Sequence, residues 1–157
     1  TFCRMDSEDF KKIDLHGPVE LALSLLQNEY RGRIEIIKEF GQLPEVECHP
    51  GRLNQVFMNL LLNACQAIEG EGKIWIRTSA GDDRIRVSVE DTGEGIDPQH
   101  LDRIFEPFFT TKPVGTGTGL GLSISYAIIQ QHNGKLEVKS ERGEGTEFLI
   151  ELPVSQT

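Results

Sequence analysis

A row of amide side chains near the middle of the chain has a spacing that suggests chemistry. Residues 53–68 contain no charged side chain, and their apolar positions recur at helical spacing. The opposite side of this predicted helix carries amides about one turn apart: Gln55, Asn59, Asn63 and Gln66. Asparagine is a poor mid-helix residue because its side chain competes for backbone groups, and an ordinary solvent face would carry Lys and Glu. We therefore predict that this stripe faces a polar ligand or a hard metal ion, with a plain solvent face as the alternative.

Asp91 is the second group, because it follows a predicted strand and opens the segment Asp91-Thr-Gly93-Glu-Gly95. A carboxylate at a strand end can accept a hydrogen bond from an exocyclic amine. The two glycines leave room for a flat ring to lie against the main chain. A simple Asp-x-Gly turn is the alternative, and this segment alone does not distinguish the two.

A second glycine-rich segment, with glycines at 115, 117, 119 and 121, runs directly into an apolar helix. Its spacing is not that of a Walker loop. Free main-chain N–H groups followed by a helix N-terminus nevertheless favour phosphate binding over a flexible linker. Lys112, just before the glycines, is either a surface lysine or a charge directed at a terminal phosphate. Phe105, Phe108 and Phe109 are either core residues or the base of a moving loop.

No nucleophilic or metal-binding constellation emerges from the other reactive residues. Ser123 and Ser125 have no paired base nearby in sequence, and the four histidines have no metal-ligand spacing. Thr146, read alone, is predicted to be structural. The pattern as a whole predicts a nucleotide held by glycine main chain, with amide oxygens coordinating a hard cation.

The elements that must hold these groups can be read in order along the chain. A helix begins near residues 14–18 and continues to Tyr30, and strands follow at 33–40 and 46–48. After the amide helix, residues 73–79 and 84–90 alternate around a turn and predict a hairpin. Residues 91–121 are irregular apart from a helical turn at 98–104, and a helix at 122–131 precedes strands at 136–140 and 146–152. This order predicts an α/β fold, a two-layer sandwich whose mostly antiparallel sheet is covered by helices on one face.

Length and composition bound the remaining possibilities. The 157 residues suggest one domain at 14–157, preceded by a linker or the tail of an earlier helix at 1–13. A net charge of -9 argues against a nucleic-acid surface. Three cysteines without a CxxC pair fit a reducing compartment. With no signal peptide and no apolar run of spanning length, we expect a cytoplasmic domain without direct membrane contact, although the parent protein is free to carry an anchor.

Five blocks, in this order, resemble the ATP-binding catalytic domain of sensor histidine kinases, a member of the superfamily shared with DNA gyrase and the large heat-shock chaperone. Gln55-x-x-x-Asn59-Leu-x-x-Asn63-Ala resembles the asparagine box, and Asp91-x-Gly93-x-Gly95 resembles the first glycine box. Residues 105–109 resemble the phenylalanine box. Gly117-x-Gly119-x-Gly121-Leu and Gly143-x-Gly145-Thr146 resemble the later glycine boxes.

The resemblance implies a cofactor, a fold and a role for each matching residue. The fold would be that superfamily's sandwich with a mobile ATP lid. Asn63 would bind Mg²⁺ with help from Asn59, and Asp91 would bind the adenine amine in the loop of Gly93 and Gly95, supported by Thr146. ATP would be covered by a lid that contains Gly117, Gly119, Leu120, Gly121 and Leu122. Lys112 would lie near the γ-phosphate.

The resemblance also implies the reaction and the partners. Hydrolytic relatives place a glutamate four residues before the metal-binding asparagine, as a general base, whereas this chain has Asn59 there. We therefore expect a protein histidine kinase. Family members usually have an acidic residue where His49 precedes Pro50, and we expect little consequence there.

The phosphoacceptor motif, a histidine followed by an acidic residue, is absent from the chain. The acceptor histidine would lie on a dimerisation domain of the same full-length protein, and a response regulator receiver domain would act downstream. A hydrolase of the same superfamily, a non-catalytic nucleotide-gated module and a plain interaction domain are the alternatives.

Overall fold

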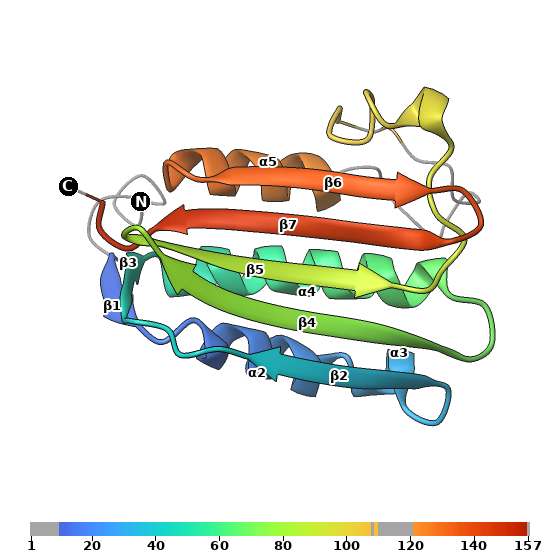
Figure 1. The fold of residues 1–157 in the computed structure, drawn as a ribbon, viewed down its shortest axis with the longest axis horizontal. Helices are drawn as coiled ribbons and strands as arrows, with labels where there is room; N and C mark the ends of the chain where they lie inside the picture. Colours follow the sequence, from blue (N-terminus) through green and yellow to red (C-terminus); the bar gives the residue numbers. More distant parts are fainter. Residues whose placement is uncertain (1–9, 108, 110–120, 157) are drawn as a thin grey trace.

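A five-stranded sheet organises the part of the chain that the computed structural model describes, residues 10–107, 109 and 121–156. Its strands are β2 (Ile34–Phe40), β4 (Gly72–Gly81), β5 (Arg84–Asp91), β6 (Lys135–Glu141) and β7 (Gly145–Pro153). They lie in the order β2-β4-β5-β7-β6 (Figure 1). β2 runs parallel to β4 and every other pair in this sheet is antiparallel, so the predicted hairpin and the mostly antiparallel sheet are confirmed.

The helices form a second layer on one face of this sheet (Figure 1). They are α2 (His16–Leu25), α3 (Gln27–Tyr30), α4 (Pro50–Ala67) and α5 (Gly121–Gln131). α4 buries the side predicted to be apolar, and Leu53, Phe57 and Leu60 are almost completely shielded from solvent. The two-layer sandwich is therefore confirmed, with α4 central in the helical layer between α2 and α5.

One predicted helix is divided in two. The apolar spacing up to Tyr30 predicts a continuous helix, but the chain leaves helical geometry at Leu26, with φ −102° and ψ 13°. Leu26 is buried at this break, and the Tyr30 hydroxyl donates to the carbonyl of Leu23 at 2.9 Å. Burial of Leu26 and this hydrogen bond turn the short α3 back onto α2 while preserving the predicted apolar face.

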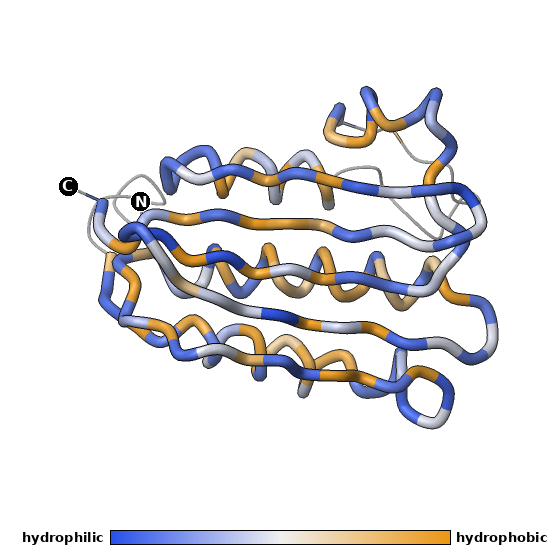
Figure 2. Tube along the Cα trace, viewed as in Figure 1, coloured by the Kyte–Doolittle hydropathy of each residue, from blue (hydrophilic) through white to orange (hydrophobic). Residues whose placement is uncertain are grey.

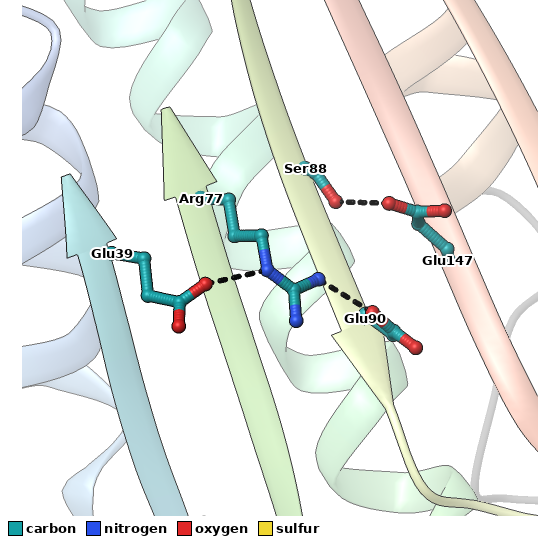
Figure 3. A network of polar contacts seen from close by, with 5 residues as sticks. All are labelled: Glu39, Arg77, Ser88, Glu90 and Glu147. Atoms are coloured by element: carbon teal, nitrogen blue, oxygen red, sulfur yellow. Dashed lines mark hydrogen bonds and ion pairs between the residues drawn. The ribbon is translucent and has the colours of Figure 1, made fainter. Parts of the chain in front are cut away.

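Hydrophobic and hydrophilic residues alternate along the strands (Figure 2), and on β4 the buried Ile74, Ile76 and Thr78 are interleaved with less buried residues. Arg77 on β4 joins Glu39 on β2 and Glu90 on β5, each at 2.6 Å (Figure 3). On the next strands the Ser88 hydroxyl donates to Glu147, also at 2.6 Å. These cross-strand contacts satisfy charged groups on the uncovered face and leave the inner face to the core.

A second, two-stranded sheet pairs β1 (Lys11–Ile13) with β3 (Val46–Cys48). The sequence suggested a linker here, because a three-residue strand containing two lysines shows no alternation. Just before β1, the Phe10 ring packs 4.3 Å from the ring of His49. The domain boundary near residue 14 stays a prediction. Among the helices described, none combines the length and the apolar character needed to cross a membrane.

Candidate functional site

The amide stripe lies on α4 where this helix meets the start of α5. Gln55 and Gln66 are exposed, whereas Asn59 and Asn63 are partly buried. The Asn59 side chain donates through Nδ2 to the carbonyl of Gly121 at 3.2 Å and to the Ser125 hydroxyl at 3.3 Å. Because these bonds use the amide nitrogen, they do not consume the oxygen Oδ1, which is the atom a hard cation would bind.

The donor set on α4 fits Mg²⁺ rather than a softer metal. Within the described residues there is no group of three or more His, Cys, Asp or Glu side chains that could hold a metal. Mg²⁺ keeps several waters and takes one or two protein oxygens together with phosphates. Asn63 and Asn59, one turn apart on the same helix, would supply two such oxygens. Their role as metal ligands stays a prediction.

Asp91 ends β5 and lies opposite Thr146 on β7. Its side chain is only 3% exposed, and its Oδ1 accepts a hydrogen bond from the backbone N–H of Gly93 at 2.8 Å. The backbone N–H of Thr146 also hydrogen-bonds this carboxyl. Burial raises the pKa of Asp91 to about 6, and the two N–H groups oppose that rise. At neutral pH the carboxylate is thus ionised, oriented and partly desolvated, as an acceptor for an amine should be.

The glycines around Asp91 are required by the protein's own backbone. A Cβ on Gly93 would lie 2.5 Å from the carbonyl oxygen of Ala67 in the last turn of α4. Gly145 has φ +112°, and its Cβ would lie 2.0 Å from the carbonyl oxygen of Asp91. Gly95 follows in the same loop, where the Glu94 carbonyl accepts from the Gly143 N–H at 2.6 Å. Close backbone packing therefore gives these glycines a structural role in addition to the predicted room for a ring.

Ser140 supports this end of the site and was not predicted. Its hydroxyl lies 2.9 Å from the Thr146 hydroxyl, donates to the Gly145 carbonyl at 2.9 Å, and accepts from the Ile96 N–H at 2.7 Å. It thus ties the loop after Asp91 to β7. Ser140 lies opposite Thr146 in the β6–β7 register, so pairing the predicted strands at 136–140 and 146–152 as a hairpin could have found it.

Backbone contacts place the two groups of predicted residues along one helix. The N–H of Glu94 donates to the Ala67 carbonyl at 3.0 Å, so the Asp91 loop rests on the end of α4. Asn63 lies one turn before Ala67, and Asn59 lies a further turn back, beside Gly121. α5 begins at Gly121, one residue before the predicted start at Leu122, and the lid roles of Gly121 and Leu122 stay predictions. Lys112, Gly117, Gly119 and Leu120 lie outside the described residues, and their phosphate roles stay predictions.

The aromatic block before the glycines packs onto the sheet and α5. The Phe105 ring lies 5.1 Å from Tyr126 on α5 and 6.4 Å from Phe148 on β7. The Phe109 ring lies 4.7 Å from the guanidinium carbon of Arg103. Phe108 lies outside the described residues. For Phe105, the core interpretation fits, since its ring joins the helical layer to β7.

The described histidines have structural surroundings. His132 and His49 are buried, and the His49 N–H donates to Nε2 of His132 at 3.1 Å. His16 lies at the start of α2, stacked on Phe40 at 4.3 Å. A hollow of about 570 Å³ between the start of α4 and α5 is lined by residues such as Arg52 and Ile128. Of the amide stripe only Gln55 lines it, and neither Asn59, Asn63 nor Asp91 does.

Comparison with known proteins places the chain in a family. A family described as histidine kinase-, DNA gyrase B-, and HSP90-like ATPase matches residues 48–156. Sensor histidine kinase ZraS of Escherichia coli strain K12 is 41% identical over 148 residues, which cover 92% of this chain and 31% of ZraS. The chain therefore spans about a third of the length of the curated relatives it matches.

Solved structures agree with the sequence match. The catalytic domain of histidine kinase ThkA has a TM-score of 0.84 and 34% identity, covering 94% of this chain and 97% of that chain. A second structure holds ThkA in complex with the response regulator protein TrrA. It matches with a TM-score of 0.80 and 32% identity, over 94% of this chain and 42% of that chain.

Proposed function

Because the chain belongs to the family of histidine kinase-, DNA gyrase B- and HSP90-like ATPases and is an ATP-binding catalytic domain of the sensor histidine kinase type, we propose that it transfers the γ-phosphoryl group of ATP to a histidine on a separate dimerisation domain. The buried Asp91 carboxylate, lying beside the last turn of the helix that carries Asn59 and Asn63, carries this proposal. The arrangement offers an adenine acceptor at the end of β5 and two cation ligands on the adjacent α4.

Each residue has a positioning role in this reaction. Asp91 accepts the adenine amine, with its carboxylate held by the N–H groups of Gly93 and Thr146. Asn63 and Asn59 hold Mg²⁺ through their amide oxygens, and the bound ion supplies charge neutralisation to the phosphates. Phosphoryl transfer depends mainly on such positioning and electrostatics, so the protein needs no nucleophile of its own.

Asn59 favours transfer over hydrolysis. Its amide cannot accept a proton, and its nitrogen is directed at Gly121 and Ser125. A water near the γ-phosphate would therefore have no general base at this position. We propose that the domain holds ATP intact until the acceptor histidine arrives.

The partners follow from the relatives. The acceptor would lie on a dimerisation and phosphoacceptor domain elsewhere in the parent protein, and the downstream partner would be a response regulator receiver domain. ThkA, a relative of this chain, has been solved in complex with a response regulator. Because the reaction consumes ATP and the described cysteines are free, we place the domain in the cytoplasm.

Calorimetric titration of the chain with ADP and a non-hydrolysable ATP analogue, with and without Mg²⁺, tests the proposal. We expect the parent to bind both, with a gain in affinity from Mg²⁺ that Asn63→Ala removes. Gln66→Ala, on the same stripe but exposed, is the matched control and should keep the gain.

Transfer of labelled phosphate from ATP to the parent protein's dimerisation domain tests the reaction itself. Steady phosphate release by the chain alone would instead indicate a hydrolase. ATP binding without transfer would indicate a nucleotide-gated module. If the folded, unsubstituted chain binds no nucleotide, the nucleotide site is rejected.

A further inference from the structure

Arg33 links three separate segments through backbone carbonyls. Its Nη1 donates to the carbonyls of Ile68 at 2.7 Å and Gly70 at 3.1 Å, and its Nη2 donates to Cys65 at 2.9 Å. Its Nε donates to Glu29 at 3.0 Å. Four of the five guanidinium N–H groups are therefore directed at main-chain oxygens rather than at a carboxylate.

Three of these carbonyls, those of Cys65, Ile68 and Gly70, belong to the end of α4 and the turn after it, whereas that of Glu29 lies on α3. The last carbonyls of a helix have no partner within the helix, and a positive charge there is favourable to the helix dipole. α4 has no basic residue in its own last turn. Arg33, immediately before β2 and distant in sequence, supplies donors to these carbonyls and the missing charge, while the Cys65 carbonyl also accepts the Ile68 N–H.

The backbone of Arg33 is itself fixed. Its N–H donates to the Tyr30 carbonyl at 3.1 Å, and its carbonyl accepts from the Gly72 N–H at 3.0 Å. The guanidinium therefore extends from an anchored point between α3 and β4. An arginine whose backbone is fixed can hold the end of a helix in position through its guanidinium group, whereas an arginine with a mobile backbone would move with the helix.

The turn that Arg33 holds is the one on which the Asp91 loop rests. The Ala67 carbonyl in this turn accepts the Glu94 N–H at 3.0 Å, and Gly93 packs so closely there that a Cβ would lie 2.5 Å from the same oxygen. Gly93 in turn donates to the Asp91 carboxylate at 2.8 Å. A movement of this turn would therefore reach Asp91 through two hydrogen bonds.

We propose that Arg33 is a positioning residue for nucleotide binding, which fixes the last turn of α4 against the Gly93–Glu94 backbone and so sets the place and burial of the Asp91 carboxylate. The inference rests on the proposed role of Asp91 at the adenine end of the site. Asn63 and Asn59 lie within the body of α4, one and two turns before the held turn, so their metal site is less dependent on Arg33.

The test measures ADP binding by the 157-residue chain without Mg²⁺, from pH 5 to pH 8, by calorimetry. In the parent, affinity should fall as Asp91 is protonated, with Glu90 beside it on β5 and Cys65 on α4 as the neighbouring ionisable groups. In Arg33→Met we expect a roughly tenfold weaker affinity at pH 7.5. The midpoint of the pH dependence of ADP affinity should lie about half a pH unit or more below that of the unsubstituted chain, because a displaced Asp91 is better solvated.

Two further variants separate positioning from general loosening. Arg33→Lys keeps the charge but not the fork, and should recover only part of the affinity and of the midpoint. Arg86→Met removes an arginine that pairs with Glu151 on the outer face of the sheet, and should leave both unchanged. If Arg33→Met does not fold, Arg33→Lys alone carries the comparison. The factor by which Mg²⁺ increases the affinity should be the same in the unsubstituted chain and in the Arg33 variants.

If the ADP affinity of Arg33→Met, or of Arg33→Lys where only that variant folds, has the same pH midpoint as that of the unsubstituted chain, the positioning role is overturned, whether or not binding is weaker. A parent chain that binds no ADP at any pH would instead reject the proposed function, so the two failures are distinguishable.

Discussion

Asp91 combines two demands that oppose each other. Its carboxylate must be ionised to accept an amine, yet it lies at the end of β5 with 3% of its surface exposed. Burial therefore raises its pKa from 3.8 to about 6, even though two backbone N–H groups bind it. Keeping it ionised at neutral pH costs roughly 3 kcal/mol of folding free energy. A group retained at such a cost is a candidate for function rather than for stability.

Asp91→Asn should separate the effect of the buried charge on stability from its effect on ADP binding. The folded pKa is raised, so the native state binds the extra proton between pH 3.8 and about 6, and stability falls as pH rises through that range. Above pH 6 the amide removes the cost of the buried charge. We expect a free energy of unfolding about 1–3 kcal/mol higher than the parent's at pH 8, measured by urea denaturation.

The same variant should bind ADP about tenfold more weakly at pH 8, because a charged acceptor for the amine is lost. In the parent, ADP affinity should fall below pH 6, and this dependence should be absent from Asp91→Asn. A variant that is less stable at pH 8 and binds ADP normally would show that the carboxylate is structural. Glu90→Gln, at the neighbouring position but on the outer face, is the control and should change neither quantity by much.

At the scale of elements, the meeting of the Asp91 loop with α4 sets the geometry of the candidate site. Gly93→Ala would place a Cβ 2.5 Å from the Ala67 carbonyl oxygen, a backbone atom that cannot move aside as the end of a flexible side chain could. We expect a loss of about 2 kcal/mol in the free energy of unfolding and weaker ADP binding. Gly51→Ala, in the first turn of the same helix with open space around it, should be neutral or stabilising by up to about 1 kcal/mol. Equal stabilities in urea for the two variants would contradict this account.

The elements themselves were largely predictable from the sequence. α4 and the β4–β5 hairpin were found because their apolar positions repeat with the period of a helix or a strand, and Asp91 was placed correctly at a strand end. β1 could not be predicted, because Lys11–Ile13 becomes a strand only through pairing with β3. The role of Arg33 depends on contacts with a segment 32 or more residues away, such as its bond to Cys65, and Ser140 adds to its local pairing with Thr146 a contact with the distant Ile96. Local pattern carries no information about such contacts.

At the scale of the whole molecule, a buried cluster joins the described ends of the chain to both helices of the site. Nδ1 of His132 donates to the Ile128 carbonyl at 2.8 Å, so Nε2 accepts from the His49 N–H at the start of α4. The Phe10 ring packs against both histidine rings, and the Gln156 side chain donates to the His132 carbonyl at 2.8 Å. One imidazole thus connects the end of α5, the start of α4 and the chain on either side of the domain.

We expect this cluster to make the stability of the whole fold fall with acid, a pH dependence opposite in sign to that contributed by Asp91. Burial lowers the pKa of His132 below its usual 6.5, with His49 and Arg52 adding to the effect. The unfolded chain therefore binds the extra proton below pH 6.5, and the stability that neutral His132 provides is lost as pH falls through its folded pKa. A protonated ring could also no longer accept the His49 N–H.

We expect the free energy of unfolding, measured in urea, to fall between pH 6.5 and pH 5. His132→Gln should be less stable than the unsubstituted chain at pH 7.5, but its free energy of unfolding should change less over this pH range. Asp91→Asn should make the acid loss steeper, because it removes the opposing contribution. His100→Gln, on the short turn at Pro98–His100, is the control and should leave the slope unchanged. If His132→Gln and the parent lose stability in parallel below pH 6.5, the acid sensitivity lies in other groups and the cluster serves packing alone.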